Sequence, residues 1–162
     1  MNQIPDKSGP VESERMLHDA SFCIVATRFN SDIVDVLVAG AQAALQRHGV
    51  AGSAIDVVHV PGAFELPLAA LKAAQTGSYD GIVALGAVVR GGTPHFEYVS
   101  AESTGGLGRV ALDTGVPIGN GVLTVDTMEQ ALERAGGSEG HKGEEAALAA
   151  IEMVHLLRQI GN

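Results

Sequence analysis

The sequence predicts a single α/β domain of the doubly wound type, a three-layer α/β/α sandwich around a four-stranded parallel sheet. Short apolar segments alternate along the chain with longer helical segments. The short segments are apolar almost throughout, which is typical of strands buried on both faces of a sheet. Because right-handed crossovers join parallel strands, the helices are expected to cover both faces. The length of 162 residues suits one such domain.

The hydrophobic pattern defines nine elements. The strand segments are rich in β-branched residues, whereas apolar residues recur on one face of the helical segments. In order, we expect strand 22–27, helix 31–48, strand 55–60, helix 64–75, strand 82–89, helix 96–114, strand 117–125, a helix from Thr127 and a last helix near 144–159.

Local signals mark where several of these elements begin and end. Asn30 or Ser31 can cap the first helix, and Gly49 suits the position just past its end. Thr127 has Gln130 three residues later, which is the pattern of a capping box. These signals support the helix limits that the hydrophobic pattern predicts.

The beginning of the chain differs from the rest. Residues 1–20 are polar and show no sustained period, so we expect a flexible or extended arm, with order beginning at Phe22 and a single domain at 21–162. This segment lacks the apolar stretch of a secretory signal. Together with a single cysteine, Cys23, this makes cytoplasmic residence the simplest interpretation.

Composition narrows the class of partner. The net charge of −9 excludes a nucleic-acid binder, and an anionic ligand must therefore be held by a few placed cations. One cysteine excludes an internal disulfide framework, and no histidine spacing indicates a metal site. No apolar run reaches the roughly 20 residues of a membrane span. The mean hydropathy of +0.19 favours a homo-oligomer, although a monomer is also compatible with it.

The chemistry is expected at one edge of the sheet. Ligands of open parallel sheets bind outside the carboxyl ends of the strands, so the segments that follow the four strands should converge there. These segments are 28–30, 61–67, 90–98 and 126–127. Four of the six aromatic side chains lie in them: Phe29, Phe64, Phe96 and Tyr98.

Two residues of this edge each have two interpretations. Phe29 is either a flat surface on which a heteroaromatic ring stacks or an apolar contact over the first helix. Glu65 is either a ligand for polar groups or a favourable charge in the first turn of a helix, and its position alone favours the second. Gly62 and Ala63 leave main-chain groups accessible just before it.

The segment RGGTPH at 90–95 is the most informative. Its two glycines permit a tight loop whose N–H groups can face an anion, and Thr93 adds a hydroxyl donor. His95 can move protons near neutral pH. The alternative is an ordinary strand-to-helix turn, since the segment matches neither the Walker loop nor the GxGxxG pattern. The histidine in the same loop favours phosphate handling.

Two cations lie on either side of the glycine-rich break at 136–143. Arg134 can be a favourable charge at a helix C-terminus, and Lys142 a solvated charge. Eight helical residues from Thr127 place Arg134 about 10–12 Å from the ligand edge, too far for the site of its own subunit. It is within reach of a neighbour's site if subunits pack edge to edge.

The same residues resemble the lumazine synthase family. The shared motifs are Arg28-Phe29-Asn30, PGAFELP at 61–67, RGGTPHFEYV at 90–99, GVLTV at 121–125, and EQALERAG followed by HKG at 129–143. The resemblance begins near Phe22 and leaves out the first twenty residues. It implies a flavodoxin-like fold and a condensation of 5-amino-6-(D-ribitylamino)uracil with 3,4-dihydroxy-2-butanone 4-phosphate, without a metal or organic cofactor.

The resemblance also implies roles for individual residues. His95 would be the acid–base residue, and Phe29 would stack on the pyrimidine. Uracil and ribityl contacts would come from Ala63, Phe64, Glu65, Ala87, Val88 and Val89. The phosphate would be bound by Gly92, Thr93, Arg134 and Lys142, the last two from the adjacent subunit. Many members carry an aromatic residue at the position of Asn120, which here is implied to hydrogen-bond the pyrimidine instead.

The resemblance implies sites between adjacent subunits of a pentamer, an arm that adds a strand to a neighbour's sheet, and riboflavin synthase as a further partner. The short break between the last two helices favours an icosahedral shell. One alternative is a flavin-binding or shell-forming relative without catalysis, against which Thr93, His95 and Arg134 together argue. Another is a flavodoxin-type electron carrier, whose phosphate loop the short segment after the first strand does not provide.

Overall fold

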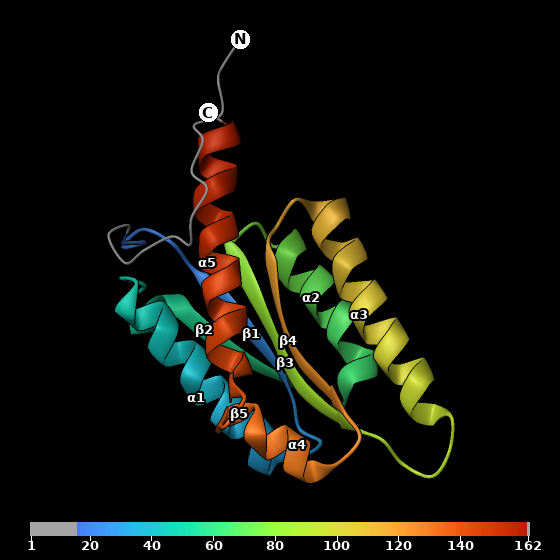
Figure 1. Ribbon diagram of the computed structural model, residues 1–162. Coiled ribbons are helices and arrows are strands. Elements are labelled where there is room, and N and C mark those ends of the chain that lie inside the picture. Colours follow the sequence, from blue (N-terminus) through green and yellow to red (C-terminus); the bar gives the residue numbers. More distant parts are fainter. Residues whose placement is uncertain (1–15, 162) are drawn as a thin grey trace.

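The structure is a computed structural model that describes residues 16–161. A four-stranded parallel sheet forms its middle layer, with the strands in the order β2-β1-β3-β4 (Figure 1). The strands are β1 (Phe22–Thr27), β2 (Ile55–Val60), β3 (Gly81–Val89) and β4 (Ile118–Val125). Each agrees with the predicted strand to within one residue, so the predicted α/β fold and its parallel sheet are confirmed.

Helices cover both faces of this sheet. α1 (Ser31–Arg47) and α5 (Lys142–Gly161) lie on one face, and α2 (Leu66–Gln75) and α3 (His95–Thr114) lie on the other (Figure 1). The short α4 (Met128–Glu133) follows β4 at the lower end of the view.

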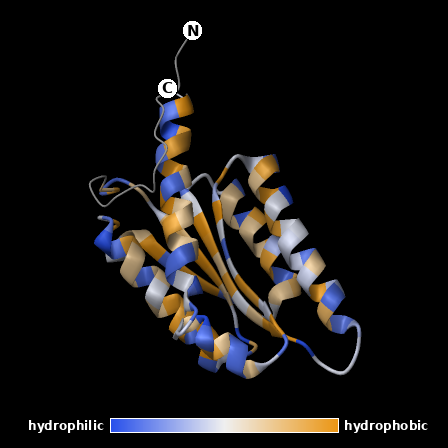
Figure 2. Cartoon of the chain, in the orientation of Figure 1, coloured by the Kyte–Doolittle hydropathy of each residue, from blue (hydrophilic) through white to orange (hydrophobic). Residues whose placement is uncertain are grey.

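Two apolar cores result, one on each face of the sheet. Figure 2 shows mostly apolar strands between helices that carry both hydrophilic and hydrophobic residues. Alternation along β1 feeds both cores: Ile24 belongs to the core under α1 and α5, whereas Val25 belongs to the core under α2 and α3.

Order begins earlier than expected. Leu17 and Ala20 are each only 1% exposed and belong to the core under α1 and α5. The main-chain N–H of Leu17 also donates to His48 O at 2.7 Å. The sequence around them is polar, and two buried positions three residues apart make no visible period, so the expectation of order from Phe22 was wrong. Residues 1–15 of the expected arm lie outside the described residues.

The glycine-rich break is a small hairpin. Its strands are β5 (Ala135–Gly137) and β6 (Gly140–His141), and Gly136 and Gly140 have φ values of 92° and 89° that favour glycine. α5 then begins at Lys142, two residues before its expected start. His141 explains the early start, because its Nδ1 accepts the main-chain N–H of Glu144 at 3.2 Å and so caps the helix.

The predicted caps have different outcomes. Gly49 follows α1 with φ 92° and is confirmed in its position. Asn30 stands before α1, but its Nδ2 donates to Ala87 O at 2.9 Å, so the expectation that its side chain caps the helix was wrong. Thr127 Oγ1 accepts the N–H of Gln130 at 3.2 Å, as predicted for the start of α4.

Glycines allow α5 to lie very close to its neighbours. A Cβ at Gly143 would stand 2.1 Å from Leu37 O of α1, and one at Gly119 would stand 2.0 Å from Ala146 O of α5. The layer formed by α1 and α5 therefore depends on these two residues having no side chain. None of the helices within residues 16–161 combines the length and apolar character of a membrane span.

Candidate active site

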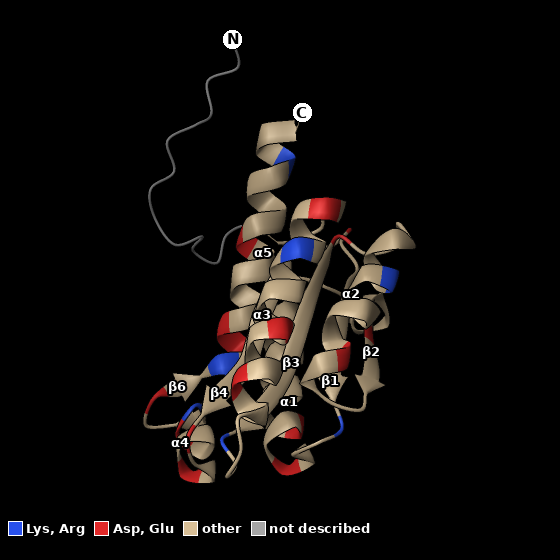
Figure 3. Ribbon diagram, turned by 90° about the vertical axis from the view of Figure 1, so that its right-hand side faces the viewer, with Lys and Arg blue, Asp and Glu red and all other residues tan. Residues whose placement is uncertain are grey.

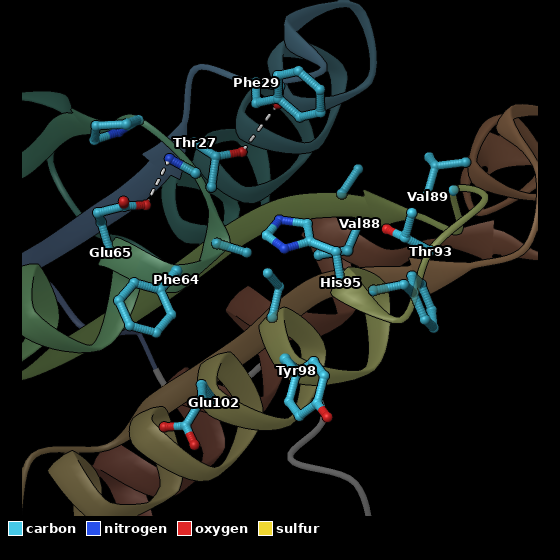
Figure 4. Close-up of a pocket in the computed structure, with 17 residues that line it drawn as sticks. Thr27, Phe29, Phe64, Glu65, Val88, Val89, Thr93, His95, Tyr98 and Glu102 are labelled. Carbon is cyan, nitrogen blue, oxygen red and sulfur yellow. Dashed lines mark hydrogen bonds between the residues drawn. The ribbon is translucent and has the colours of Figure 1, made fainter.

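A cavity of about 830 Å³ opens at the carboxyl ends of the strands, where the ligand edge was expected (Figure 4). Segments that follow β1, β2 and β3 supply its walls, together with the first two turns of α3. The lining residues that the sequence already indicated are Phe29, Ala63, Phe64, Glu65, Ala87, Val88, Val89, Thr93 and His95. The structure therefore brings together nine of the thirteen predicted site residues within one protomer.

The floor of the cavity is the end of β3. The pairing of β3 with β1 ends at Leu85 opposite Ala26, whereas its pairing with β4 continues to Val89 opposite Val125. The last residues of β3 thus extend past β1, at the point where the strand order reverses. This is the place where an open parallel sheet leaves room for a ligand.

Main-chain polar groups of β3 face this room. The N–H of Arg90 donates to Val125 O at 2.8 Å, toward β4. Successive strand residues direct their main-chain groups to opposite sides, so Val89 directs its N–H and C=O away from β4, into the space beyond β1. On the same side, the C=O of Ala87 already accepts a hydrogen bond from the side-chain amide of Asn30. A planar ligand with its own donors and acceptors can pair with this edge.

Phe29 is held by its backbone while its ring stays exposed. Its N–H donates to Pro61 O at 3.2 Å, and its C=O accepts the hydroxyl of Thr27 at 3.2 Å. The ring is 71% exposed. An apolar contact over the first helix would cover most of the ring, so the structure favours the interpretation of Phe29 as a surface for stacking. Phe64 and Tyr98 are exposed in the same cavity.

Glu65 stabilises its own turn and also lines the cavity. It lies at the end of the short helix η2 (Ala63–Glu65), and its Oε2 accepts the N–H of Gly62 at 3.1 Å. This contact stabilises the turn. Figure 4 shows the carboxylate on the wall of the cavity beside Phe64. Among residues 16–161 the second carboxylate oxygen has no hydrogen-bond partner, which leaves it for a polar ligand.

The first two turns of α3 supply a wall that the sequence indicated only in part. His95, Tyr98, Val99 and Glu102 line the cavity at helical spacing, and the His95 imidazole lies in the middle of the view in Figure 4. The sequence did not indicate Glu102, Val99 or Thr27 as site residues. The spacing of four and seven residues from His95, which keeps side chains on one face of a helix, was the signal that could have found the two on α3.

Four predicted residues do not line the cavity of their own protomer: Gly92, Asn120, Arg134 and Lys142. Gly91 lines it in place of Gly92. Asn120 pairs with Ala84, three residues before Ala87 on β3, which places it about 10 Å below the cavity floor at 3.3 Å per residue. The guanidinium of Arg134 turns back onto its own helix, where it donates to Gln130 O at 3.0 Å.

The charge of the cavity does not suit an anion by itself. Its lining residues include the carboxylates of Glu65 and Glu102 but no lysine or arginine. Figure 3 shows acidic and basic residues close together along the chain around α4. Within the described residues, a phosphate in this cavity would therefore rely on Thr93, on main-chain N–H groups and on a cation from elsewhere.

A model of the 6,7-dimethyl-8-ribityllumazine synthase family matches residues 19–158, most of the chain. The chain belongs to the lumazine synthase family. It is thus a transferase enzyme that forms a lumazine in riboflavin biosynthesis. The match begins at residue 19, close to the buried Leu17 and Ala20 at which the described domain begins.

The lone cysteine of this family member lies outside the cavity. Cys23 is buried in β1, and burial, with a smaller effect of the nearby Asp56 carboxylate, raises the pKa of its thiol to about 11. The thiol therefore stays protonated at neutral pH and serves as packing, as the sequence suggested.

Proposed function

We propose that this chain condenses 5-amino-6-(D-ribitylamino)uracil with 3,4-dihydroxy-2-butanone 4-phosphate, and that phosphate and 6,7-dimethyl-8-ribityllumazine are the products. The amine attacks the ketone and water leaves, which gives a Schiff base. Phosphate is then eliminated, and the ring closes with loss of a second water. The observation that carries the proposal is the convergence of Phe29, Thr93 and His95 on one cavity at the switch point of the sheet.

The pyrimidine would lie between Phe29 and the end of β3. Its polar edge would pair with the main-chain N–H and C=O of Val89, beside Val88 in the cavity wall, and its face would stack on the exposed Phe29 ring. Ala63, Phe64 and Glu65 would hold the ribityl chain, with the second oxygen of Glu65 accepting from its hydroxyls. Positioning of the two substrates would supply most of the rate, and proton transfer by His95 a smaller part.

The phosphate would lie at Gly92 and Thr93. The cations missing from the cavity would be Arg134 and Lys142 of an adjacent subunit, and Asn120 of that subunit would hydrogen-bond the pyrimidine. Two observations support a site shared in this way: the cavity has two carboxylates and no cation among its described residues, and Asn120 is exposed on the edge strand β4. A cofactor has no step in this reaction.

The assembly would be a homopentamer. The resemblance and the short β5–β6 hairpin favour further assembly of pentamers into an icosahedral shell. Riboflavin synthase would be a further partner. Exposed apolar side chains of the protomer, among them Leu68, Leu112 and Leu132, support association. A cytoplasmic location completes the proposal.

The reaction is tested by mixing the purified chain with both substrates. We expect a lumazine absorbance to appear together with one phosphate per product. Absence of product from a folded protein that still binds the ribitylaminouracil or riboflavin would favour a binding relative without catalysis and would overturn the proposal.

The shared site is tested by complementation. Arg134→Ala and His95→Ala subunits, each nearly inactive alone, are co-expressed with different tags and purified as mixed oligomers. If the guanidinium comes from the neighbour, about a quarter of the sites in an equal mixture carry both intact residues. Activity no greater than that of the two variants alone would place Arg134 in the site of its own subunit.

A further inference from the structure

The side chain of Arg90 joins three segments that surround the active site. Its Nε donates to Asp126 Oδ1 at 2.7 Å, just past the end of β4. Its Nη1 donates to the carboxylate of Glu97 in the first turn of α3. Its guanidinium carbon lies 4.4 Å from the centre of the Phe96 ring. One residue at the end of β3 thus contacts both the start of α3 and the end of β4.

The loop that Arg90 closes has few other constraints. It runs from Gly91 to Pro94, and both of its glycines have open space where a side chain would stand. In the part of the chain that the structure describes, Gly91, Gly92 and Thr93 make no hydrogen bond. Arg90 at one end of the loop binds Phe96 and Glu97 at the other. Its side chain therefore spans the loop and fixes the distance between its ends.

The contact with Asp126 extends this effect to α4. The N–H of Asp126 donates to the side-chain amide of Gln130 at 2.7 Å, and the N–H of Gln130 donates to Thr127 at 3.2 Å. These bonds set the first turn of α4, the helix at whose C-terminal end Arg134 lies. Arg90 thus connects the loop with Thr93 and His95 to the helix that precedes Arg134.

Arg90 itself is poorly placed to bind phosphate. Two of its N–H groups already donate to carboxylates, and Phe96 covers one face of the guanidinium. The two carboxylates also neutralise its charge. In keeping with these contacts, the hydrogen bond from Arg90 lowers the pKa of Glu97 below its usual value. Lysine could not make the same contacts, because it lacks the planar fork that reaches two carboxylates and stacks on a ring.

We propose that Arg90 is a positioning residue of the reaction. Its guanidinium holds the loop Gly91–Pro94 and the starts of α3 and α4 in the arrangement that places Thr93 and His95 against the phosphate-bearing substrate, and it does so without touching that substrate. This inference rests on the proposed function, since it names the group that the arranged loop serves.

The test compares four variants in the full-length protein. Arg90→Gln and Arg90→Lys remove the fork, whereas Glu97→Gln and Asp126→Asn each remove one partner and leave Arg90 in place. The control is Arg109→Gln, whose guanidinium lies on the exposed surface of α3 beside Asp113 at 4.0 Å. The measurements are kcat, the KM of each substrate, thermal stability and oligomer size.

For Arg90→Gln and Arg90→Lys we expect the KM of the phosphate-bearing substrate to rise at least about tenfold and kcat to fall, while the KM of the ribitylaminouracil changes less than about threefold. Glu97→Gln and Asp126→Asn should show smaller changes in the same direction. Arg109→Gln should match the unchanged protein. A purely structural surface ion pair would leave both KM values unchanged.

Two results would overturn the proposal. One is a folded Arg90→Gln variant with kcat and both KM values within about twofold of the unchanged protein. The other is recovery of the phosphate-substrate KM in Arg90→Lys with no effect of Glu97→Gln or Asp126→Asn, which would make Arg90 a direct ligand. If Arg90→Gln fails to fold, the two partner variants decide, and wild-type kinetics in both would overturn the proposal.

Lumazine formation by the unchanged protein shows whether a negative result concerns the proposed function or the role of Arg90. If it forms no lumazine, the proposed function fails, and calorimetric titration with inorganic phosphate then replaces kinetics. Binding at least about fivefold weaker in Arg90→Gln than in Arg109→Gln would support the positioning role. Equal binding would overturn it.

Discussion

Replacement of Phe29 by alanine separates the two interpretations of this residue. The ring is 71% exposed, so folding covers less than a third of it. For a side chain of about 200 Å², the lost burial is roughly 60 Å², or at most about 1.5 kcal/mol of folding stability at 25 cal/mol per Å². A pyrimidine stacked on one face would cover roughly half of the exposed area, about 70 Å². With the stacking contribution, this amounts to about 2 to 3 kcal/mol of binding.

The kinetic consequence is a large change in one constant. We expect Phe29→Ala to raise the KM of the ribitylaminouracil by about 30- to 150-fold, since each 1.4 kcal/mol is a factor of ten. The KM of the phosphate-bearing substrate should change far less. The assay follows lumazine absorbance with each substrate varied in turn, beside a thermal unfolding curve.

Two further variants control this experiment. Phe29→Tyr keeps the ring and should remain close to the unchanged protein. Arg109→Ala removes a side chain that is 82% exposed on α3 and should alter neither constant. A Phe29→Ala variant that loses stability while its KM stays within about threefold would refute the stacking role and support an apolar contact over α1.

The remaining predictions concern three other residues. His95→Gln should lower kcat by about 10²-fold or more with little change in either KM, as measured in the same assay, and an unchanged kcat would remove His95 from proton transfer. Gly143→Ala should lower the free energy of unfolding by about 1 to 3 kcal/mol in a urea titration, because its Cβ meets Leu37 O, whereas Gly105→Ala in open space should not be destabilised. Cys23, with its pKa raised to about 11, should resist alkylation at pH 8.5 in the native protein and react promptly in urea; rapid native labelling would contradict its burial. Because the folded pKa is the higher one, the stability linked to Cys23 is complete below about pH 9 and is lost as the pH rises toward 11.

The sheet was predictable because its signal is local. A strand such as Gly81–Val89, in the middle of the sheet, is buried over most of its length and therefore reads as an unbroken apolar run. The crossover rule then gives the layers, and the switch-point rule gives the edge at which ligands bind. The aromatic residues and His95 needed no structure to be assigned to that edge, because each lies within ten residues after the end of a strand.

Other features depend on contacts that no local pattern records. Leu17 is buried in the core and bonds through its N–H to His48 O, thirty-one residues away, and the Asn30 side chain donates to a carbonyl of β3 instead of capping its own helix. The network of Arg90 likewise joins residues up to thirty-six positions apart. In the sequence Arg90 was only the first residue of a motif, because an arginine before two glycines does not indicate which carboxylates its guanidinium will contact.

Under the proposed function, the charge of the cavity favours association of subunits in addition to the burial of apolar side chains. Carboxylates line the cavity of one protomer, and the net charge of the chain is −9, so a lone subunit repels a doubly charged phosphate. A neighbour that brought Arg134 and Lys142 would offset the two carboxylates with two positive charges. Phosphate then binds the assembled state far better than the separated one, and at a hundred times its dissociation constant it stabilises each completed site by about 2.7 kcal/mol. Substrate binding and subunit association are therefore thermodynamically linked, so each would strengthen the other. An interface held by Leu112 and Leu132 alone would show no such dependence on phosphate.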